Sequence, residues 1–135
     1  MSRPRFRQLP HAADLRLAIW GRSEEELLRN AVAGVVRAAL AGPAGGVPER
    51  WAMVERWPAS LSGRLVGAIN EALFYLYSRR LVAVASSFSA TSGRLGLVPL
   101  AAGRQPAIEI KAATFYDLRL EAVGQSLRAI VTLDL

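Results

Sequence analysis

The sequence predicts an α+β fold in which two helices pack on one face of a mostly antiparallel sheet. Two stretches carry apolar residues at helical spacing, and several shorter ones alternate apolar and polar residues as half-buried strands do. Most of the strand-like stretches follow the second helical one, an order that favours α+β over repeated βαβ units. With 135 residues, 52% of them hydrophobic, the chain predicts one domain, 1–135, with a sizeable core.

The N-terminal part predicts two strands and a helix. Residues 6–8 form the first expected strand, and the alternation over 15–20 predicts a second that ends at Gly21. The run Ser-Glu-Glu-Glu at 23–26 is a capping box, and its acids complement the helix dipole. Apolar residues at helical spacing continue until Gly-Pro at 42–43, so the helix is expected from Glu24 to Leu40.

The middle of the chain predicts a connector and a third strand. The connector, 42–48, is rich in glycine and proline, but it lacks the lysine and Ser/Thr of a phosphate-binding loop. It therefore predicts no nucleotide site. The alternation over 50–57 predicts a strand that stops at Pro58.

A second helix and five strands complete the expected fold. Ser60 or Ser62 caps the helix, whose apolar stripe covers 61–77 and whose end at 78–80 carries two arginines suited to a helix C-terminus. Gly124-Gln125 predicts a tight turn between the last two strands. The expected strands are 81–89, 94–100, 107–114, 115–123 and 127–133.

The composition excludes several kinds of site. The chain has no cysteine, which rules out disulfides, thiolate metal sites and cysteine nucleophiles and agrees with a reducing compartment. The one histidine, His11, gives neither a Ser-His-Asp set nor zinc-ligand spacing. No signal-peptide pattern begins the chain, and no apolar run approaches the roughly 20 residues that span a bilayer. These features predict a cytoplasmic protein with no membrane segment.

The basic balance leaves two interpretations open. The net charge is +6, and every basic residue except Lys111 is an arginine. Arginine suits phosphate and carboxylate partners, so the balance favours nucleic acid or a protein that handles it. The arginines are scattered along the sequence, however, which equally fits an arginine-rich proteome.

Two aspartates far apart in the sequence form the best candidate for a chemical site. Asp14 enters the strand at 15–20, and Asp134 ends the last strand next to Leu135. If these strands are neighbours, both aspartates and the terminal carboxylate of Leu135 meet. Oxygen ligands of this kind suit a hard divalent cation such as calcium or magnesium. The alternative is a loop-capping Asp14 and a solvated C-terminus.

Four landmarks along the chain resemble those of the archease family. They occur in the family's order and cover essentially the whole sequence. The landmarks are His11-Ala12-Ala13-Asp14 with the following strand and capped helix, the helical run 65–75 containing Asn70-Glu71, the strand Lys-Ala-Ala-Thr-Phe-Tyr at 111–116, and the hydrophobic strand 130–135 with its penultimate aspartate.

The resemblance implies an archease-like α+β fold and a role as a protein cofactor rather than an enzyme. Archeases act with the tRNA-splicing RNA ligase that joins a 3′-phosphate end to a 5′-hydroxyl end. They promote guanylylation of the ligase and allow multiple turnover. The implied metal ligands are Asp14 and Asp134, with calcium, magnesium or manganese as the ion. RNA would be met indirectly, through the ligase.

Three positions depart from the family pattern. The motif threonine is Ala12, the position before His11 is Pro10 where an acid is common, and the late histidine is Tyr116. Fewer carboxylates neutralise a divalent ion less well, so a diverged archease-fold protein with a weakened metal site is an alternative.

His11 and Lys111 are candidate contacts for a partner or phosphate. In the alternative, His11 hydrogen-bonds its own loop, and Lys111 pairs with Glu109 or Asp117. Two further functions stay open. One is a direct RNA-binding module that uses the arginines. The other is a metal-dependent hydrolase, for which His11 is the obvious general base.

Overall fold

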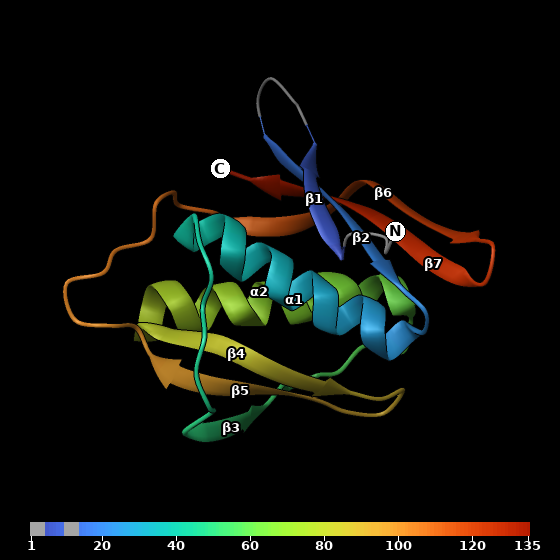
Figure 1. The fold of residues 1–135 in the computed structure, drawn as a ribbon. Coiled ribbons are helices and arrows are strands. Elements are labelled where there is room, and N and C mark those ends of the chain that lie inside the picture. Colours follow the sequence, from blue (N-terminus) through green and yellow to red (C-terminus); the bar gives the residue numbers. More distant parts are fainter. Residues whose placement is uncertain (1–4, 10–13) are drawn as a thin grey trace.

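In the computed structural model, which describes residues 5–9 and 14–135, two helices lie between two antiparallel sheets (Figure 1). One sheet has four strands in the order β1-β2-β7-β6, and the other has three in the order β3-β5-β4. Both helices contact strands of both sheets. The elements are β1 (Phe6–Leu9), β2 (Leu15–Gly21), α1 (Glu24–Leu40), β3 (Arg50–Met53), α2 (Leu61–Arg79), β4 (Leu81–Phe88), β5 (Gly93–Pro99), β6 (Ala112–Val123) and β7 (Ser126–Asp134).

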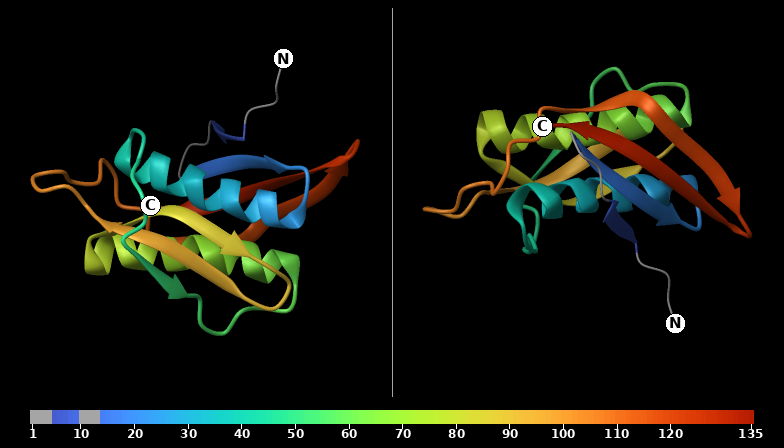
Figure 2. Two further views of the ribbon diagram at one scale, coloured as in Figure 1. Left: turned by 60° about the horizontal axis from the view of Figure 1, so that its bottom comes forward. Right: turned by 90° about the horizontal axis from the view of Figure 1, so that it is seen from above.

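The predicted fold class is confirmed, and the structure refines it. The strands divide between two sheets, and each sheet turns one face to the helix pair. The core fills the space between these layers, so apolar residues of β2, β5 and β7 are as fully buried as those of the helices. Figure 2 shows that the turn of the β6–β7 hairpin and the C-terminal end of β7 lie at opposite ends of the four-stranded sheet.

Helix α1 has the predicted bounds because its ends are specified locally. The Ser23 hydroxyl accepts from the Glu26 amide at 3.1 Å, and the Glu26 carboxylate accepts from the Arg22 amide at 3.1 Å. Ala41 in the left-handed region ends the helix. The strand before it packs so closely that a Cβ at Gly21 would lie 2.4 Å from the backbone nitrogen of Leu27. Only glycine fits there.

Helix α2 is capped by Ser60, whose hydroxyl accepts from the Gly63 amide at 3.0 Å. Its first turns are tied to α1 through Arg64, a side chain that is almost fully buried. The Arg64 guanidinium donates to Glu24 at 3.0 Å and to the carbonyl of Ala59 at 2.7 Å. These bonds compensate the cost of burying a charge.

Two strand predictions are wrong in part. The strand expected over 50–57 ends at Met53. The stretch 107–114 is not a separate strand, because 107–111 has no regular structure and 112–114 begins the long strand β6. The Tyr77 hydroxyl donates to the Ile108 carbonyl at 2.8 Å and accepts from the Ile110 amide at 2.9 Å. The Ile108 carbonyl and the Ile110 amide, which a strand would use for pairing, are thus hydrogen-bonded to Tyr77 of helix α2.

Within the part of the chain that the structure describes, neither helix has the length and apolar character needed to cross a membrane.

Candidate metal centre

The candidate metal centre lies at one end of the four-stranded sheet, where β2 and β7 are antiparallel neighbours. Leu15 pairs with Leu133, and extending this register by one residue brings Asp14 beside Asp134. Leu133 is fully buried, so side chains alternate and Asp134 faces away from the core. Asp14 is half-buried and Asp134 is exposed. We call this pair the carboxylate end.

Strand β6, which pairs with β7 on the side away from β2, also reaches the carboxylate end. The Lys111 amide donates to the Asp134 carbonyl at 2.8 Å, which fixes the backbone of the last strand residue. The Lys111 side chain is exposed, as is Leu135 at 49%. An ion pair of Lys111 with Glu109 or Asp117 is not found among residues 5–9 and 14–135. His11, Ala12 and Pro10 lie outside the described residues.

Asn70 on α2 supports this end of β6, a role that the sequence did not indicate. Its side-chain oxygen accepts from the Ala113 amide at 2.7 Å, and its amide nitrogen donates to the Ala113 carbonyl at 3.3 Å. The side chain thus pairs with the outer edge of β6 as a neighbouring strand would. Asn70 therefore fixes the start of β6, and β6 pairs with Asp134 at this end of β7.

A bulge in β6 places a further charged pair next to the aspartates. Between Thr114 and Arg119 the register shifts, so residues 115–118 lie opposite a single residue of β7. Asp117 in this bulge has a φ of 54° and contacts the Arg16 guanidinium at 3.0 Å. Arg16 pairs with Thr132 on the strand face that also carries Asp134. Arg16 therefore lies two residues from Asp14 along β2, and its pairing partner Thr132 lies two residues from Asp134 along β7. Asp117 partly neutralises the charge of Arg16.

The donor set fits a hard divalent cation that takes most of its ligands from elsewhere. Two adjacent carboxylates supply oxygen ligands, but calcium takes about 6–8 oxygens and magnesium about six. Among the described residues no group of three or more His, Cys, Asp or Glu side chains is suited to hold a metal ion. Water or a partner would complete the coordination.

The other titrating groups near α2 are part of the scaffold. Burial raises the pKa of the Tyr77 phenol, which is opposed by its hydrogen bond to Ile110 and assisted by the charge of Glu109. Burial also raises the pKa of the Glu71 carboxyl, and the negative charge of Glu55 adds to this effect. Tyr77 keeps its proton for the bond to Ile108, so neither group points to catalysis.

Residues 6–135 match the model of the archease protein family (MTH1598/TM1083). The chain belongs to this family. The match includes Asp14 and Asp134 and spans every element of both sheets. No curated protein matches the sequence.

Two solved structures share the archease fold with this chain. The crystal structure of an archease described as a possible chaperone, TM1083 from Thermotoga maritima, has a TM-score of 0.66 and 21% identity, and the match covers 100% of this chain and 98% of that one. The solution structure of Methanobacterium thermoautotrophicum protein 1598 has a TM-score of 0.64 and 19% identity, with 97% and 99% covered. The likeness establishes the fold.

Proposed function

We propose that the chain is a non-enzymatic protein cofactor of a cytoplasmic tRNA-splicing RNA ligase. In this role it promotes guanylylation of the ligase and its multiple turnover, and Asp14 and Asp134 hold a divalent cation. The observation that carries the proposal is the adjacency of these two aspartates in a member of the archease family. The Thermotoga maritima archease is described as a possible chaperone, which is likewise a role exercised on a partner protein.

The chain's own residues would present carboxylates rather than carry out a reaction. Asp134 is exposed, and its backbone is fixed by the hydrogen bond from Lys111 and by pairing with Ala112 of β6, so its carboxylate is available to a partner. A bound divalent cation would screen phosphate charge in the partner's active site. The incomplete donor set leaves ligand positions for that partner.

The test is a ligation assay with the purified natural ligase, GTP, a divalent metal and RNA with 3′-phosphate and 5′-hydroxyl ends. The wild-type protein is expected to raise the yield above one product per ligase. Asp14→Ala and Asp134→Ala are each expected to abolish this stimulation while leaving the thermal unfolding transition in place. Glu49→Ala removes an exposed acid directly before β3 of the other sheet and serves as the charge-matched control.

Two outcomes would contradict the proposal. If the wild-type protein does not stimulate the ligase at any metal concentration, the cofactor role is wrong. If both aspartate variants stimulate as well as Glu49→Ala does, the metal role of the carboxylate end is wrong.

A further inference from the structure

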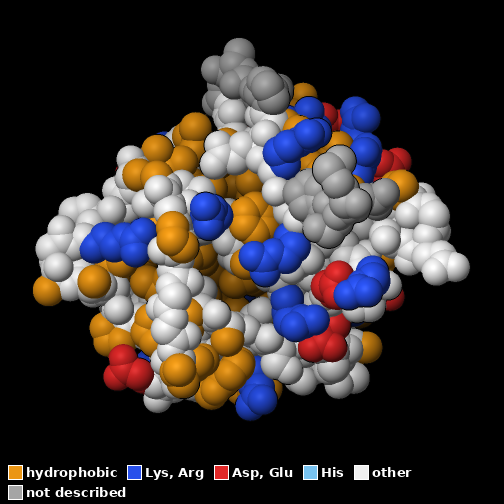
Figure 3. Space-filling model, in the orientation of Figure 1, with side chains coloured by type: hydrophobic (Ala, Val, Ile, Leu, Met, Phe, Trp, Pro, Cys, Tyr) orange, Lys and Arg blue, Asp and Glu red, His pale blue; other side chains and the backbone are white. Residues whose placement is uncertain are grey.

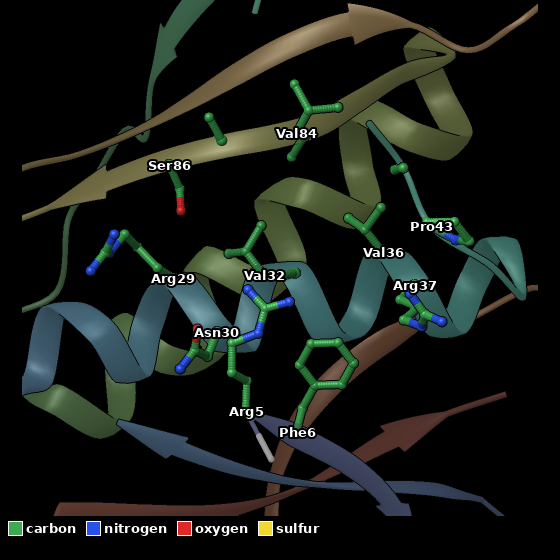
Figure 4. A pocket seen from close by; sticks show the side chains of 14 residues that line it. Arg5, Phe6, Arg29, Asn30, Val32, Val36, Arg37, Pro43, Val84 and Ser86 are labelled. Atoms are coloured by element: carbon green, nitrogen blue, oxygen red, sulfur yellow. The ribbon is translucent and has the colours of Figure 1, made fainter. Parts of the chain in front are cut away.

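The outer face of α1 carries a groove lined with arginines, apart from the residues of the carboxylate end. Its hollow has a volume of about 350 Å³ and lies between β1, α1, the connector after α1 and β4. Figure 3 shows a hydrophobic floor surrounded by basic side chains. Figure 4 shows Arg29 and Arg37 along α1, with Arg5 and Phe6 on one side and Val84 and Ser86 on the other. We call this hollow the arginine groove.

The cations of the arginine groove have no carboxylate partner within the described chain, although Arg5 lies over the Phe6 ring at 5.9 Å from its centroid. Arg5, Arg29 and Arg37 are exposed, and no Asp or Glu among the described residues lines the groove. The ion pairs among residues 5–9 and 14–135 involve other arginines. Arg37 suits the C-terminal end of α1, but Arg29 in the middle of the helix has no such explanation. Three uncompensated guanidinium groups around one hollow attract an anion.

The floor of the arginine groove is apolar and held in place. Val32, Val36 and Val84 line it, with Phe6 at the side. Phe6 packs on the helix backbone where Gly34 leaves room, since a Cβ there would lie 2.9 Å from the Phe6 ring. A small hydrated anion gains nothing from such a floor. A ligand that joins phosphate to a flat apolar group uses both the cations and the floor.

A second hollow continues the arginine groove along β1. It has a volume of about 280 Å³, shares Phe6 and Arg37 with the first, and adds Arg7. Arg29 and Arg37 are two helical turns apart, about 12 Å along the axis at 1.5 Å per residue. The cations therefore follow a path longer than one nucleotide. The path suits a chain of repeated phosphates.

We infer that the arginine groove binds a segment of single-stranded RNA, with phosphates on Arg5, Arg29 and Arg37 and bases over the apolar floor. The choice of RNA over DNA rests on the proposed function, which supplies an RNA partner. An acidic peptide is the weaker alternative, because carboxylates on small side chains would leave the apolar floor unused. Direct contact of this chain with RNA goes beyond action on a ligase.

The test measures binding by fluorescence anisotropy of a labelled 12-nucleotide single-stranded RNA, without ligase or divalent metal. Arg29→Gln/Arg37→Gln is expected to weaken binding about tenfold or more. The control Arg50→Gln/Arg56→Gln loses the same charge from exposed positions near the three-stranded sheet and is expected to change affinity by less than about threefold. The slope of log K against log salt should fall by about 1.4 in the groove variant only, since each phosphate contact contributes about 0.7 for single strands.

Three results would overturn the inference. If the two double variants weaken binding equally, the net charge alone attracts RNA. If guanosine monophosphate displaces the RNA at concentrations near the RNA dissociation constant, the groove is a mononucleotide site. If RNA does not bind but a labelled poly-glutamate peptide does, and loses affinity in the groove variant, the partner is an acidic protein. The ligation assay of the proposed function is independent of all three.

Discussion

The carboxylate end and the arginine groove differ in how the chain holds their charged groups. At the carboxylate end, the surrounding groups are bonded within the chain: Lys111 to the Asp134 carbonyl, Asn70 to Ala113 and Arg16 to Asp117. In the arginine groove, Arg5, Arg29 and Arg37 have no carboxylate partner in the described part of the chain.

The two regions therefore differ in how much their charged groups contribute to folding. Supporting bonds at the carboxylate end fix a backbone, so their loss costs stability as well as function. Exposed arginines without carboxylate partners contribute little to folding, so their loss mainly changes what they bind. Substitutions in the two regions should therefore have opposite signatures in unfolding and binding experiments.

The largest expected effect on stability is that of Asn70→Ala. The substitution leaves the amide and carbonyl of Ala113, a residue that is 4% exposed, without their side-chain partner. The free energy of unfolding should fall by about 1–3 kcal/mol, measured by urea denaturation. Arg29→Gln should stay within about 0.5 kcal/mol of the wild type. Equal stability of the two variants would remove the contrast between the regions.

A smaller effect is expected for cation binding in Arg16→Gln. Removal of this positive charge leaves Asp117 with Arg119 alone, 3.5 Å away, as its cationic partner on the same side of the sheet as Asp134, so calcium affinity should rise roughly three- to tenfold. Isothermal titration calorimetry measures the change, with calcium as the probe. Arg22→Gln alters net charge equally at the other end of β2 and should leave affinity nearly unchanged. A similar rise in both variants would show that only net charge matters.

The smallest effect concerns the pH dependence of stability through Glu71. Burial raises the pKa of this carboxyl, so the folded state retains a proton that the unfolded state has lost, and stability falls as pH rises through that window. Glu71→Gln should remove this fall. Above the window the variant should be more stable than the wild type by less than about 1 kcal/mol, because water screens the half-buried charge. Below pH 4 the unfolding curves should coincide, and a gain that persists there would contradict this cause.

The elements with local signals could be predicted closely from the sequence. Helix α1 and strand β2 have the expected bounds, because Ser23, Glu26 and Gly21 specify their ends within a few residues. The expected strand at 107–114 failed for a non-local reason. Its alternation of isoleucine with charged residues resembles a strand, but Tyr77 and the Ala39 carbonyl take up the backbone groups.

For the two candidate sites too, prediction from the sequence is limited where the site depends on contacts between distant segments. The pairing of β2 with β7, on which the meeting of Asp14 and Asp134 depended, is present. Their metal binding stays a prediction. The arginine groove could not be predicted, since Phe6, Arg29 and Val84 come from three elements whose packing is set by the whole core. Asn70 was visible as a polar residue on an apolar helix, yet nothing in the sequence indicates its partner Ala113.

The pairing of β2 with β7 also bears on how the chain folds. These strands lie near opposite ends of the described chain, so their pairing closes a long loop and is entropically late. During synthesis the β7-facing edge of β2 stays unpaired in the β1–β2 hairpin until β7 has been synthesised. The three-stranded sheet and both helices can form first, from closer segments. The carboxylate end would then be among the last parts to assemble, which makes its presence a mark of complete folding.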